Sequence, residues 1–371
     1  MDAGKATISG VFNGSRLLEI PFYQRAYVWG EEQWERFLGD MEFVTASKRP
    51  YFLGSIILKQ ESSGYTWSEV SEVRTVIDGQ QRLTTMVIFF KALCAKIDAN
   101  RLFERDFVLE TGEVALRHGK YDRQDFEKVV NATGSEPVEG SSAIIGAYNY
   151  FLKNIDPEKV DRNTIKSNVQ FVCIDLTEGE DEQQIFDTIN SLGVRLTTAE
   201  LLKNYFFNRE NEQAFKDSWE DVFEPTAEKK SFWDQEVVTG RIKRTLIDLF
   251  FDAFLQIMVQ DKARCVTAED KLYYSRTSNL FQSYKDFISR YCDGGKDEVL
   301  NAMNAYAAVF ESTFDPTCCD RNVPPAPSTE RMNVLIFGLK NSTLIPYVLY
   351  VRKSVESPDE QAKVFATLES Y

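Results

Sequence analysis

The sequence predicts an α+β protein made of two domains, a mixed α/β domain over residues 1–210 and an all-helical domain over residues 211–371. Three observations support this prediction. The chain of 371 residues is long enough for two domains of ordinary size. Every apolar run of strand length lies in the first domain. Beyond residue 210, apolar side chains recur at helical spacing and almost no strand pattern remains.

The first domain is predicted to combine strands with amphipathic helices. Runs of apolar and β-branched residues predict strands at Tyr51–Lys59, Arg74–Ile77 and Val169–Leu176. Apolar spacing and N-cap residues predict helices over Glu31–Val44, from Gly79 to about Ile97, to about Asn190, and from Thr197 or Thr198 through Phe207. Residues 104–157 are polar with a helical pattern, so we expect a helical insertion there, and Ser62–Glu72 is expected to be a polar loop or hairpin.

The second domain is predicted to consist of helices alone. Their apolar spacing places them at 213–223, 241–260, 268–291, 296–313, 328–340 and 343–355. In the most apolar of these segments Asp248, Asp252 and Gln256 recur every four residues. That spacing puts the three side chains on one side, which predicts a polar stripe on an otherwise buried helix.

Composition excludes several classes of function. A hydrophobic content of 43% and an aromatic content of 13% indicate a folded globular protein. The net charge of −14 argues against non-specific coating of nucleic acid, which depends on Lys and Arg neutralising phosphates, although a local basic cleft is compatible with it. The single histidine, His118, excludes histidine-based nucleases, Ser-His-Asp hydrolases and multi-histidine zinc sites built from this chain alone.

The cellular compartment is also suggested by the sequence. The six cysteines show no C-x-x-C spacing and are expected to be reduced thiols. No signal peptide and no membrane-spanning segment is visible, so we expect a cytoplasmic protein without a membrane partner.

The segment 76–85, VIDGQQRLTT, carries the strongest chemical pattern in the chain. A predicted strand ends at Asp78, Gly79 allows a sharp turn, and a helix follows. Free backbone N–H groups and the helix dipole favour phosphate at such a junction. Arg82 could clamp that phosphate, Gln80 and Gln81 could position water, and Asp78 could hold Mg²⁺. The alternative is an Asp N-cap followed by a solvated first turn. Neither a Walker loop nor a G-x-G-x-x-G motif supports a standard nucleotide fold.

Two further segments carry polar groups among apolar ones. Ile20–Trp29, IPFYQRAYVW, places Arg25 among aromatic residues, which suits stacking on bases and pairing with phosphate; the alternative is a buried extended segment. In Phe186–Lys203, FDTINSLGVRLTTAELLK, Asn190 could orient phosphate or metal-bound water. The alternative there is a helix C-cap.

Together with Tyr51–Leu58, YFLGSIIL, these segments resemble the N-terminal domain family of GmrSD-type, modification-dependent restriction systems. The resemblance covers about residues 8–208, and the family core is similar to the ParB/sulfiredoxin-like fold, which binds nucleotides without a Walker loop. It implies binding and hydrolysis of a nucleoside triphosphate at Asp78, Gln80, Gln81 and Arg82, with Mg²⁺ at Asp78. It further implies that nucleotide or DNA phosphate contacts Tyr23, Gln24, Arg25, Gly79, Thr84, Asn190 and Lys203.

The resemblance also implies partners. Complete members of the family commonly carry a His-Asn-His nuclease domain, which this chain with its single histidine lacks, so we expect DNA cleavage to require a nuclease domain outside these residues. The expected partners are a nucleoside triphosphate, DNA including modified DNA, that nuclease domain, and a second copy in a possible homo-oligomer. The predicted function is the regulatory and DNA-sensing portion of a restriction or anti-phage defence protein. Two alternatives are a modified-DNA-binding module without turnover and a degenerate scaffold.

Overall fold

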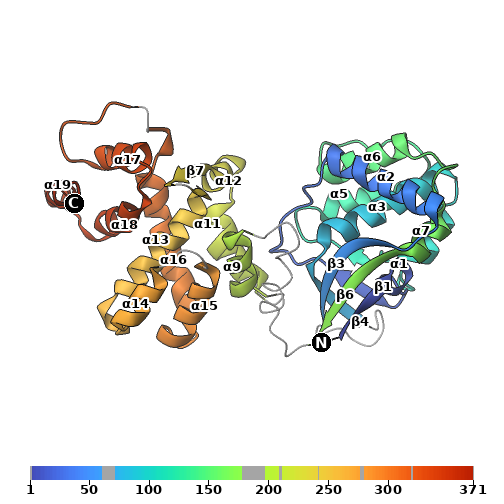
Figure 1. The fold of residues 1–371 in the computed structure, drawn as a ribbon, viewed down its shortest axis with the longest axis horizontal. Coiled ribbons are helices and arrows are strands. Elements are labelled where there is room, and N and C mark those ends of the chain that lie inside the picture. The colour runs from blue at the N-terminus through green and yellow to red at the C-terminus, as the bar shows by residue number, and fades with distance from the viewer. Residues whose placement is uncertain are drawn as a thin grey trace. The chain divides into compact units, whose positions relative to one another are not determined.

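The structure is a computed structural model that describes residues 2–60, 72–177, 197–208, 211–240, 242–275, 280–318 and 321–370. The chain divides into two compact units, Met1–Arg195 and Leu196–Tyr371 (Figure 1). The predicted helix ending near Asn190 and nearly all of the predicted loop Ser62–Glu72 lie outside the described residues. The division falls before α9 (Thr198–Phe206), because this helix packs against α13 and α15 of the second unit.

The first unit is built on a mixed sheet of six described strands in the order β1-β6-β3-β4-β2-β5. Strand β3 runs parallel to β6 and antiparallel to β4, whereas β2 runs parallel to both β4 and β5. The bounds are β1 Asp2–Thr7, β2 Arg16–Glu19, β3 Tyr51–Gln60, β4 Glu72–Asp78, β5 Leu116–Arg117 and β6 Val169–Leu176. The three predicted strands are confirmed, and they occupy adjacent central positions in the sheet.

Seven described helices accompany this sheet: α1 Ile8–Val11, α2 Glu31–Ser47, α3 Gln80–Lys96, α4 Asn100–Phe107, α5 Arg123–Val130, α6 Ala143–Asn154 and α7 Arg162–Asn168. Figure 1 shows α2, α3, α5 and α6 grouped over the same face of the sheet. Helix α3 is buried over nearly its whole length because α4, α5 and α6 all pack on it. The region 104–157, expected as an insertion, therefore supplies part of the same hydrophobic core.

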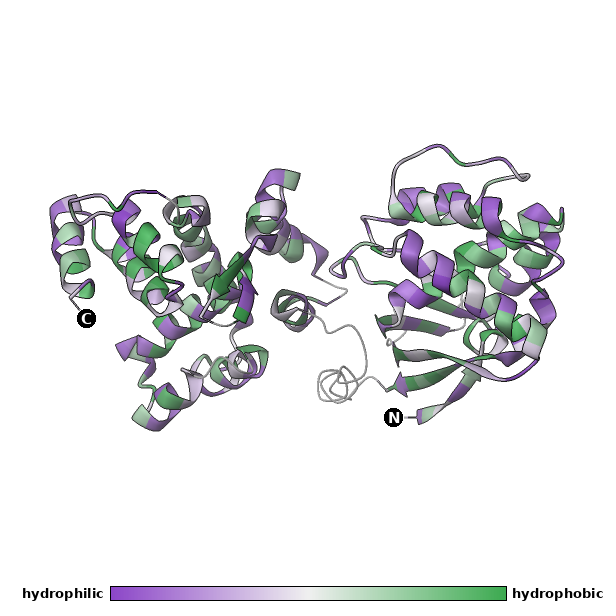
Figure 2. Ribbon diagram, turned by 45° about the horizontal axis from the view of Figure 1, so that its top comes forward, coloured by the Kyte–Doolittle hydropathy of each residue, from purple (hydrophilic) through white to green (hydrophobic). Residues whose placement is uncertain are grey.

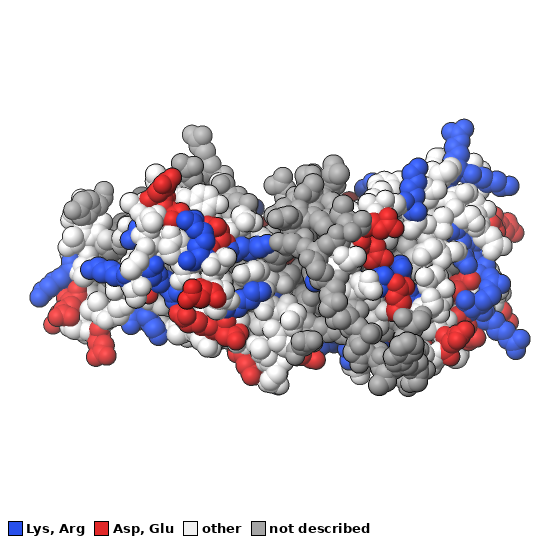
Figure 3. Space-filling view, turned by 90° about the horizontal axis from the view of Figure 1, so that it is seen from below, with Lys and Arg blue, Asp and Glu red and all other residues white. Residues whose placement is uncertain are grey.

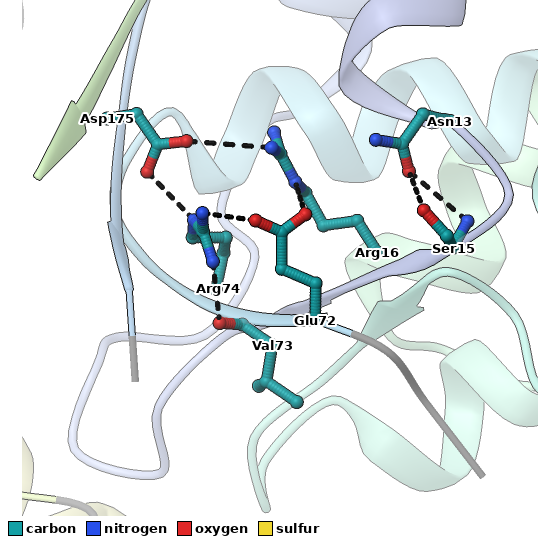
Figure 4. A network of polar contacts seen from close by, with 7 residues as sticks. All are labelled: Asn13, Ser15, Arg16, Glu72, Val73, Arg74 and Asp175. Atoms are coloured by element: carbon teal, nitrogen blue, oxygen red, sulfur yellow. Dashed lines mark hydrogen bonds and ion pairs between the residues drawn. The ribbon is translucent and has the colours of Figure 1, made fainter. Parts of the chain in front are cut away.

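A ring of alternating charges joins three strands of the sheet (Figure 4). Arg16 Nε lies 3.1 Å from Glu72 Oε2, and Arg16 Nη2 lies 3.6 Å from Asp175 Oδ2. Arg74 closes the ring with Nε 2.8 Å from Asp175 Oδ1 and with a second ion pair to Glu72. Because β3 separates β4 from β6 in the sheet, the Arg74–Asp175 pair spans β3 and ties its two neighbours together.

The second unit is helical apart from one hairpin. Its helices are α9, α10 Glu212–Phe215, α11 Asp221–Phe223, α12 Ala227–Asp234, α13 Leu246–Gln260, α14 Ala268–Tyr274, α15 Leu280–Tyr291, α16 Lys296–Thr313, α17 Thr329–Gly338, α18 Ile345–Ser354 and α19 Pro358–Leu368. A π-helical turn, Lys216–Glu220, connects α10 to α11. Helix α13 is central, because it packs against α12, α14, α15, α16 and α18. Figure 2 shows hydrophilic and hydrophobic residues side by side along helices of both units, as expected for amphipathic elements.

The prediction of helices alone in the second unit is wrong at residues 242–245, which were expected to be helical. Strands β7 (Glu236–Thr239) and β8 (Ile242–Thr245) form an antiparallel hairpin there. Gly240 at its turn has φ 61°, and its N–H donates to Lys340 O at 2.9 Å. The predicted helix therefore begins only after Thr245, whose side chain caps α13. Among the described residues, no helix is both long enough and apolar enough to cross a membrane.

The predicted polar stripe on α13 is confirmed, and two of its members are buried carboxylates. Asp248 and Asp252 each keep one oxygen buried without a hydrogen-bond partner among the described residues. Burial raises the pKa of both side chains, and the guanidinium of Arg244 beside them partly offsets this shift. Gln256, the third member, donates to Tyr274 O at 2.7 Å and so joins α13 to α14.

Replacing Asp248 by asparagine is expected to stabilise the protein at neutral pH, by about 1 kcal/mol. At low pH the carboxyl group is protonated in the folded and the unfolded chain alike. As pH rises above the ordinary aspartate pKa of 3.8, the unfolded chain ionises first, so the wild type loses stability up to the raised folded pKa. Melting temperatures at pH 4 and pH 7 check this, and an equal effect of Asp248→Asn at both values contradicts it.

Candidate functional site

The candidate site begins at the junction of β4 and α3. Strand β4 ends at Asp78, Gly79 has φ 99°, and α3 starts at Gln80. A side chain at residue 79 would place its Cβ 2.6 Å from Ile56 Cγ2, so only glycine fits this turn. Leu83 N–H donates to Gly79 O as the first helical hydrogen bond, and the N–H groups of residues 80–82 precede it. The predicted strand-to-helix junction is confirmed.

The alternative reading of this motif as an Asp N-cap with a solvated turn is wrong. The N-cap residue is Gly79, and no side chain caps α3. Gln80 and Gln81 are only 6% and 9% exposed. Their burial follows from the segment of residues 20–30, which has no regular secondary structure and lies against the junction.

Gln80 and Gln81 hold the backbone of this irregular segment. Gln80 Nε2 donates to Arg25 O at 2.7 Å, and Gln81 Nε2 donates to Ala26 O at 3.2 Å. Gln81 Oε1 accepts the Val28 N–H at 2.9 Å. A backbone without strand or helix partners needs such acceptors and donors when it is buried. Both amide groups therefore already donate to the backbone, and water positioning by them stays a prediction.

Gln24 makes the reciprocal contact from the irregular segment to the strand. Its Nε2 donates to Val76 O at 2.6 Å and to Ile77 O at 3.3 Å. A register shift in the β3–β4 pairing leaves Ile77 out of the ladder, because Ile57 pairs with Asp78 and Leu58 with Val76. Tyr23 is buried with its ring edge-on to Phe22, and Arg25 is half-buried. The structure thus brings Tyr23, Gln24 and Arg25 together with the junction.

Arg82 lies on the first turn of α3 and reaches back over β3. Its Nη2 donates to Ser55 O at 2.6 Å and lies 3.0 Å from Asp78 Oδ2. Its Nε is buried and has no hydrogen-bond partner among the described residues. Gly54, with φ 132°, makes room for the guanidinium, since a Cβ there would stand 3.1 Å from Arg82 Cδ and Nε. The sequence did not indicate the part played by Ser55 and Gly54.

A second group of polar contacts lies further along α3. Tyr27 OH lies 2.6 Å from Thr85 Oγ1 and accepts a hydrogen bond from Trp34 Nε1 at 2.9 Å. Burial raises the pKa of Tyr27. Thr84, one residue earlier, is fully buried and lies 3.1 Å from His118 Nε2. Thr84 is therefore a core contact of the only histidine and lies inside the unit.

The third predicted segment is described only in part. Asn190 lies outside the described residues. Lys203 is buried on α9 in the second unit, where its ammonium group pairs with Glu224 and lies 5.5 Å from the centre of the Trp219 ring. Trp219 Nε1 also donates to Glu224 at 3.2 Å. Within the second unit Lys203 thus has a structural role that its sequence pattern did not predict.

No ready-made metal centre is found among the described residues, since none of them form a group of three or more His, Cys, Asp or Glu side chains. Asp78 is the only carboxylate of the motif, and it faces Arg82. A single carboxylate suits Mg²⁺ only when phosphate oxygens and water supply the remaining ligands. The residues therefore fit a metal that arrives with a phosphate ligand, and do not fit a resident protein-bound ion.

Comparison with known protein families matches residues 8–207, more than half of the chain, to the family described as GmrSD restriction endonuclease, N-terminal domain. A search of curated proteins found no match. The matched residues include the whole junction, the irregular segment and α9. The chain belongs to the GmrSD restriction endonuclease N-terminal domain family, and so to a restriction and defence system.

Proposed function

We propose that the first unit binds a nucleoside triphosphate together with Mg²⁺ at the junction of β4 and α3, and hydrolyses it. The observation that carries this proposal is Arg82, whose Nε is buried and lacks a hydrogen-bond partner among the described residues. An unpaired buried guanidinium N–H is costly, and an incoming phosphate oxygen would satisfy it. The N–H groups of residues 80–82 and the helix dipole add to the attraction for phosphate.

The residues of the site take distinct roles in this proposal. Arg82 binds phosphate, and its present partner Asp78 becomes available to a metal once phosphate replaces the carboxylate beside the guanidinium. Mg²⁺ would supply neutralisation of phosphate charge. Gln80 and Gln81 hold the irregular segment beside the junction through the backbone carbonyls of Arg25 and Ala26, and Tyr23 and Arg25 would contact the ligand from that segment. The ion pair between Arg82 and Asp78 at 3.0 Å is the contact that phosphate would replace.

Nucleotide turnover is proposed to serve regulation within a restriction or anti-phage defence protein of the cytoplasm. The family is described as part of a restriction endonuclease. Cleavage of DNA is assigned to a nuclease domain that these residues do not supply, since the chain has a single histidine and that histidine is buried. The ParB/sulfiredoxin-like relationship of the core and the sensing of modified DNA belong to the same proposal.

Phosphate release from GTP, ATP, CTP and UTP with Mg²⁺ tests the proposed function. We expect the wild type to hydrolyse at least one nucleotide, and Arg82→Ala and Asp78→Ala to lower the rate by about 100-fold or more, because charge stabilisation of phosphate is lost. Arg321→Ala is a matched control, since this arginine is half exposed in the second unit. Equal rates in wild type, Arg82→Ala and Asp78→Ala contradict the assignment.

A DNA-binding module without turnover is the second candidate, and the hairpin β7–β8 favours it. Ile242 is 63% exposed, and the Lys243 side chain beside it is 71% exposed. Figure 3 shows acidic and basic side chains interspersed over the face in view, so a DNA contact would be local. A salt-dependent mobility-shift assay with modified and unmodified duplexes separates the two candidates, because binding without any phosphate release supports the second.

A further inference from the structure

The only histidine of the chain lies in a buried chain of polar contacts next to the candidate site. His118 is 2% exposed and packs against the Phe126 ring, with 4.3 Å between ring centres. Its Nε2 lies 3.1 Å from Thr84 Oγ1, on the helix that carries Gln80 and Gln81. Its Nδ1 lies 3.7 Å from Asp122 Oδ2, which is beyond hydrogen-bonding distance, and has no hydrogen-bond partner among the described residues. Burial lowers the pKa of His118, so the ring is neutral at physiological pH.

The protonation of this ring follows from its neighbours. A neutral imidazole has one donor and one acceptor nitrogen, and the nearby carboxylate favours the proton on Nδ1. Nε2 is then the acceptor, and the Thr84 hydroxyl donates to it. His118 thus contacts the motif helix α3 through Thr84 and lies beside Asp122.

Asp122, next to His118, also contacts the irregular segment. Its Oδ2 accepts the Tyr27 N–H at 2.7 Å, two residues after Arg25. Gly119 packs on the same segment, because a Cβ there would stand 2.8 Å from Pro21 O. The loop of residues 118–122 therefore touches the irregular segment at Pro21 and again at Tyr27.

The irregular segment is thus held between two supports that are far apart in the sequence. Gln80 and Gln81 hold its backbone at residues 25–28 from the α3 side, and Asp122 holds Tyr27 from the loop side. Tyr23, Gln24 and Arg25 have no helix or strand of their own to fix them. Their positions depend on these hydrogen bonds, because a buried backbone group that loses its partner is costly.

We propose that Asp122 is a positioning residue of the nucleotide site. Through its hydrogen bond to Tyr27 N–H, it sets the position of the segment that carries Tyr23, Gln24 and Arg25. The effect on nucleotide binding rests on the proposed function. The effect on the segment itself does not, because it follows from the hydrogen bonds alone.

The test compares Asp122→Ala with Asp122→Asn in the full chain. Alanine removes the acceptor for Tyr27 N–H, whereas asparagine keeps an oxygen acceptor of similar position. Hydrogen exchange of the peptide covering residues 20–30 is expected to be at least about tenfold faster in Asp122→Ala and close to wild type in Asp122→Asn. Asp125→Ala is the matched control, since Asp125 pairs with Lys128 on α5.

Nucleotide binding supplies the second measurement, with GTP and ATP titrated in Mg²⁺ at a temperature where circular dichroism shows each variant folded. Asp122→Ala is expected to weaken binding at least about tenfold, and Asp122→Asn to restore it to within about threefold of wild type. Equal exchange in wild type and Asp122→Ala overturns the inference, as does an equal loss in Asp122→Asn or Asp125→Ala. A wild type that binds no nucleotide overturns the proposed function instead, and the exchange measurement still decides the role of Asp122.

Discussion

Replacing Arg74 by alanine is expected to lower the free energy of unfolding of the first unit by about 3–5 kcal/mol. Arg74 is 7% exposed and pairs with both Glu72 and Asp175. Its loss leaves two carboxylates with Arg16 as the remaining cation of the ring (Figure 4). Charges taken out of water are stabilised mainly by their partners, so two largely buried carboxylates that share a single cation are costly.

A double variant separates this charge imbalance from the loss of packing. Arg74→Met combined with Asp175→Leu keeps the Arg16–Glu72 pair and removes one charge of each sign, so we expect it to be more stable than Arg74→Ala. Lys128→Ala serves as the control, because its pair with Asp125 is on the surface and should matter little. Urea unfolding followed by hydrogen exchange of the β4 peptide reports on this unit. A loss below about 1 kcal/mol for Arg74→Ala contradicts the prediction.

Nucleotide affinity is expected to fall about tenfold in Arg82→Lys and about 100-fold or more in Arg82→Ala. Lysine keeps the charge but loses the planar group, including the Nε that is buried without a partner among the described residues. The shape of the guanidinium matters because it lies on the backbone of β3 at Gly54, with Nη2 donating to Ser55 O at 2.6 Å.

Gly54→Ala tests this arrangement without altering Arg82. The added Cβ would stand 3.1 Å from Arg82 Cδ and Nε, so we expect it to displace the guanidinium and weaken nucleotide binding about as much as Arg82→Lys. Gly14→Ala is the matched control: Gly14 also has a positive φ, 80°, but a Cβ there would meet no atom within 4 Å. Isothermal titration of all four variants measures the affinities. Unchanged nucleotide binding in Gly54→Ala, or equally weakened binding in Gly14→Ala, contradicts a role for the contact between the Arg82 guanidinium and the β3 backbone at Gly54.

The elements that were predicted correctly are those with strong periodic patterns. Strands β3, β4 and β6 are rich in apolar and β-branched residues, and they lie next to one another at the centre of the sheet. Helix α2 has Trp34, Phe37 and Met41 on its buried face, as its spacing indicates. Strands β1, β2 and β5 lie toward the edges of the sheet and are short or polar, so local sequence shows little of them.

The hairpin β7–β8 was missed for a related reason. Its strands have four residues each, and Val238 and Ile242 point toward solvent with 40% and 63% exposure. The alternation of buried and exposed residues that reveals a strand is therefore weak. The hairpin is held instead by contacts with distant residues, such as the hydrogen bond from Gly240 N–H to Lys340 O.

For the candidate site, residue types at short range were enough to locate the junction. A strand that ends in Asp-Gly before an apolar helix requires a left-handed residue at the turn, and Gly79 has that conformation. The contacts of the individual side chains could not be predicted from these residue types. Gln80 and Gln81 suggested water positioning, yet both are hydrogen-bonded to the backbone of residues 25–28. Lys203 suggested phosphate, yet it pairs with Glu224 in the second unit.

The sequence by itself determined the α+β class, the strand-to-helix junction and the family, because these depend on periodicity and on motifs that are contiguous in the chain. Only the tertiary structure decided which groups meet at the junction. Three such contacts are Asp122 with Tyr27, Gly54 with Arg82, and His118 with Thr84. The residues of each pair are at least 28 positions apart in the sequence, the smallest separation being that of Gly54 and Arg82. Such contacts arise when a buried, irregular backbone finds hydrogen-bond partners in the folded chain, and no local pattern records that pairing.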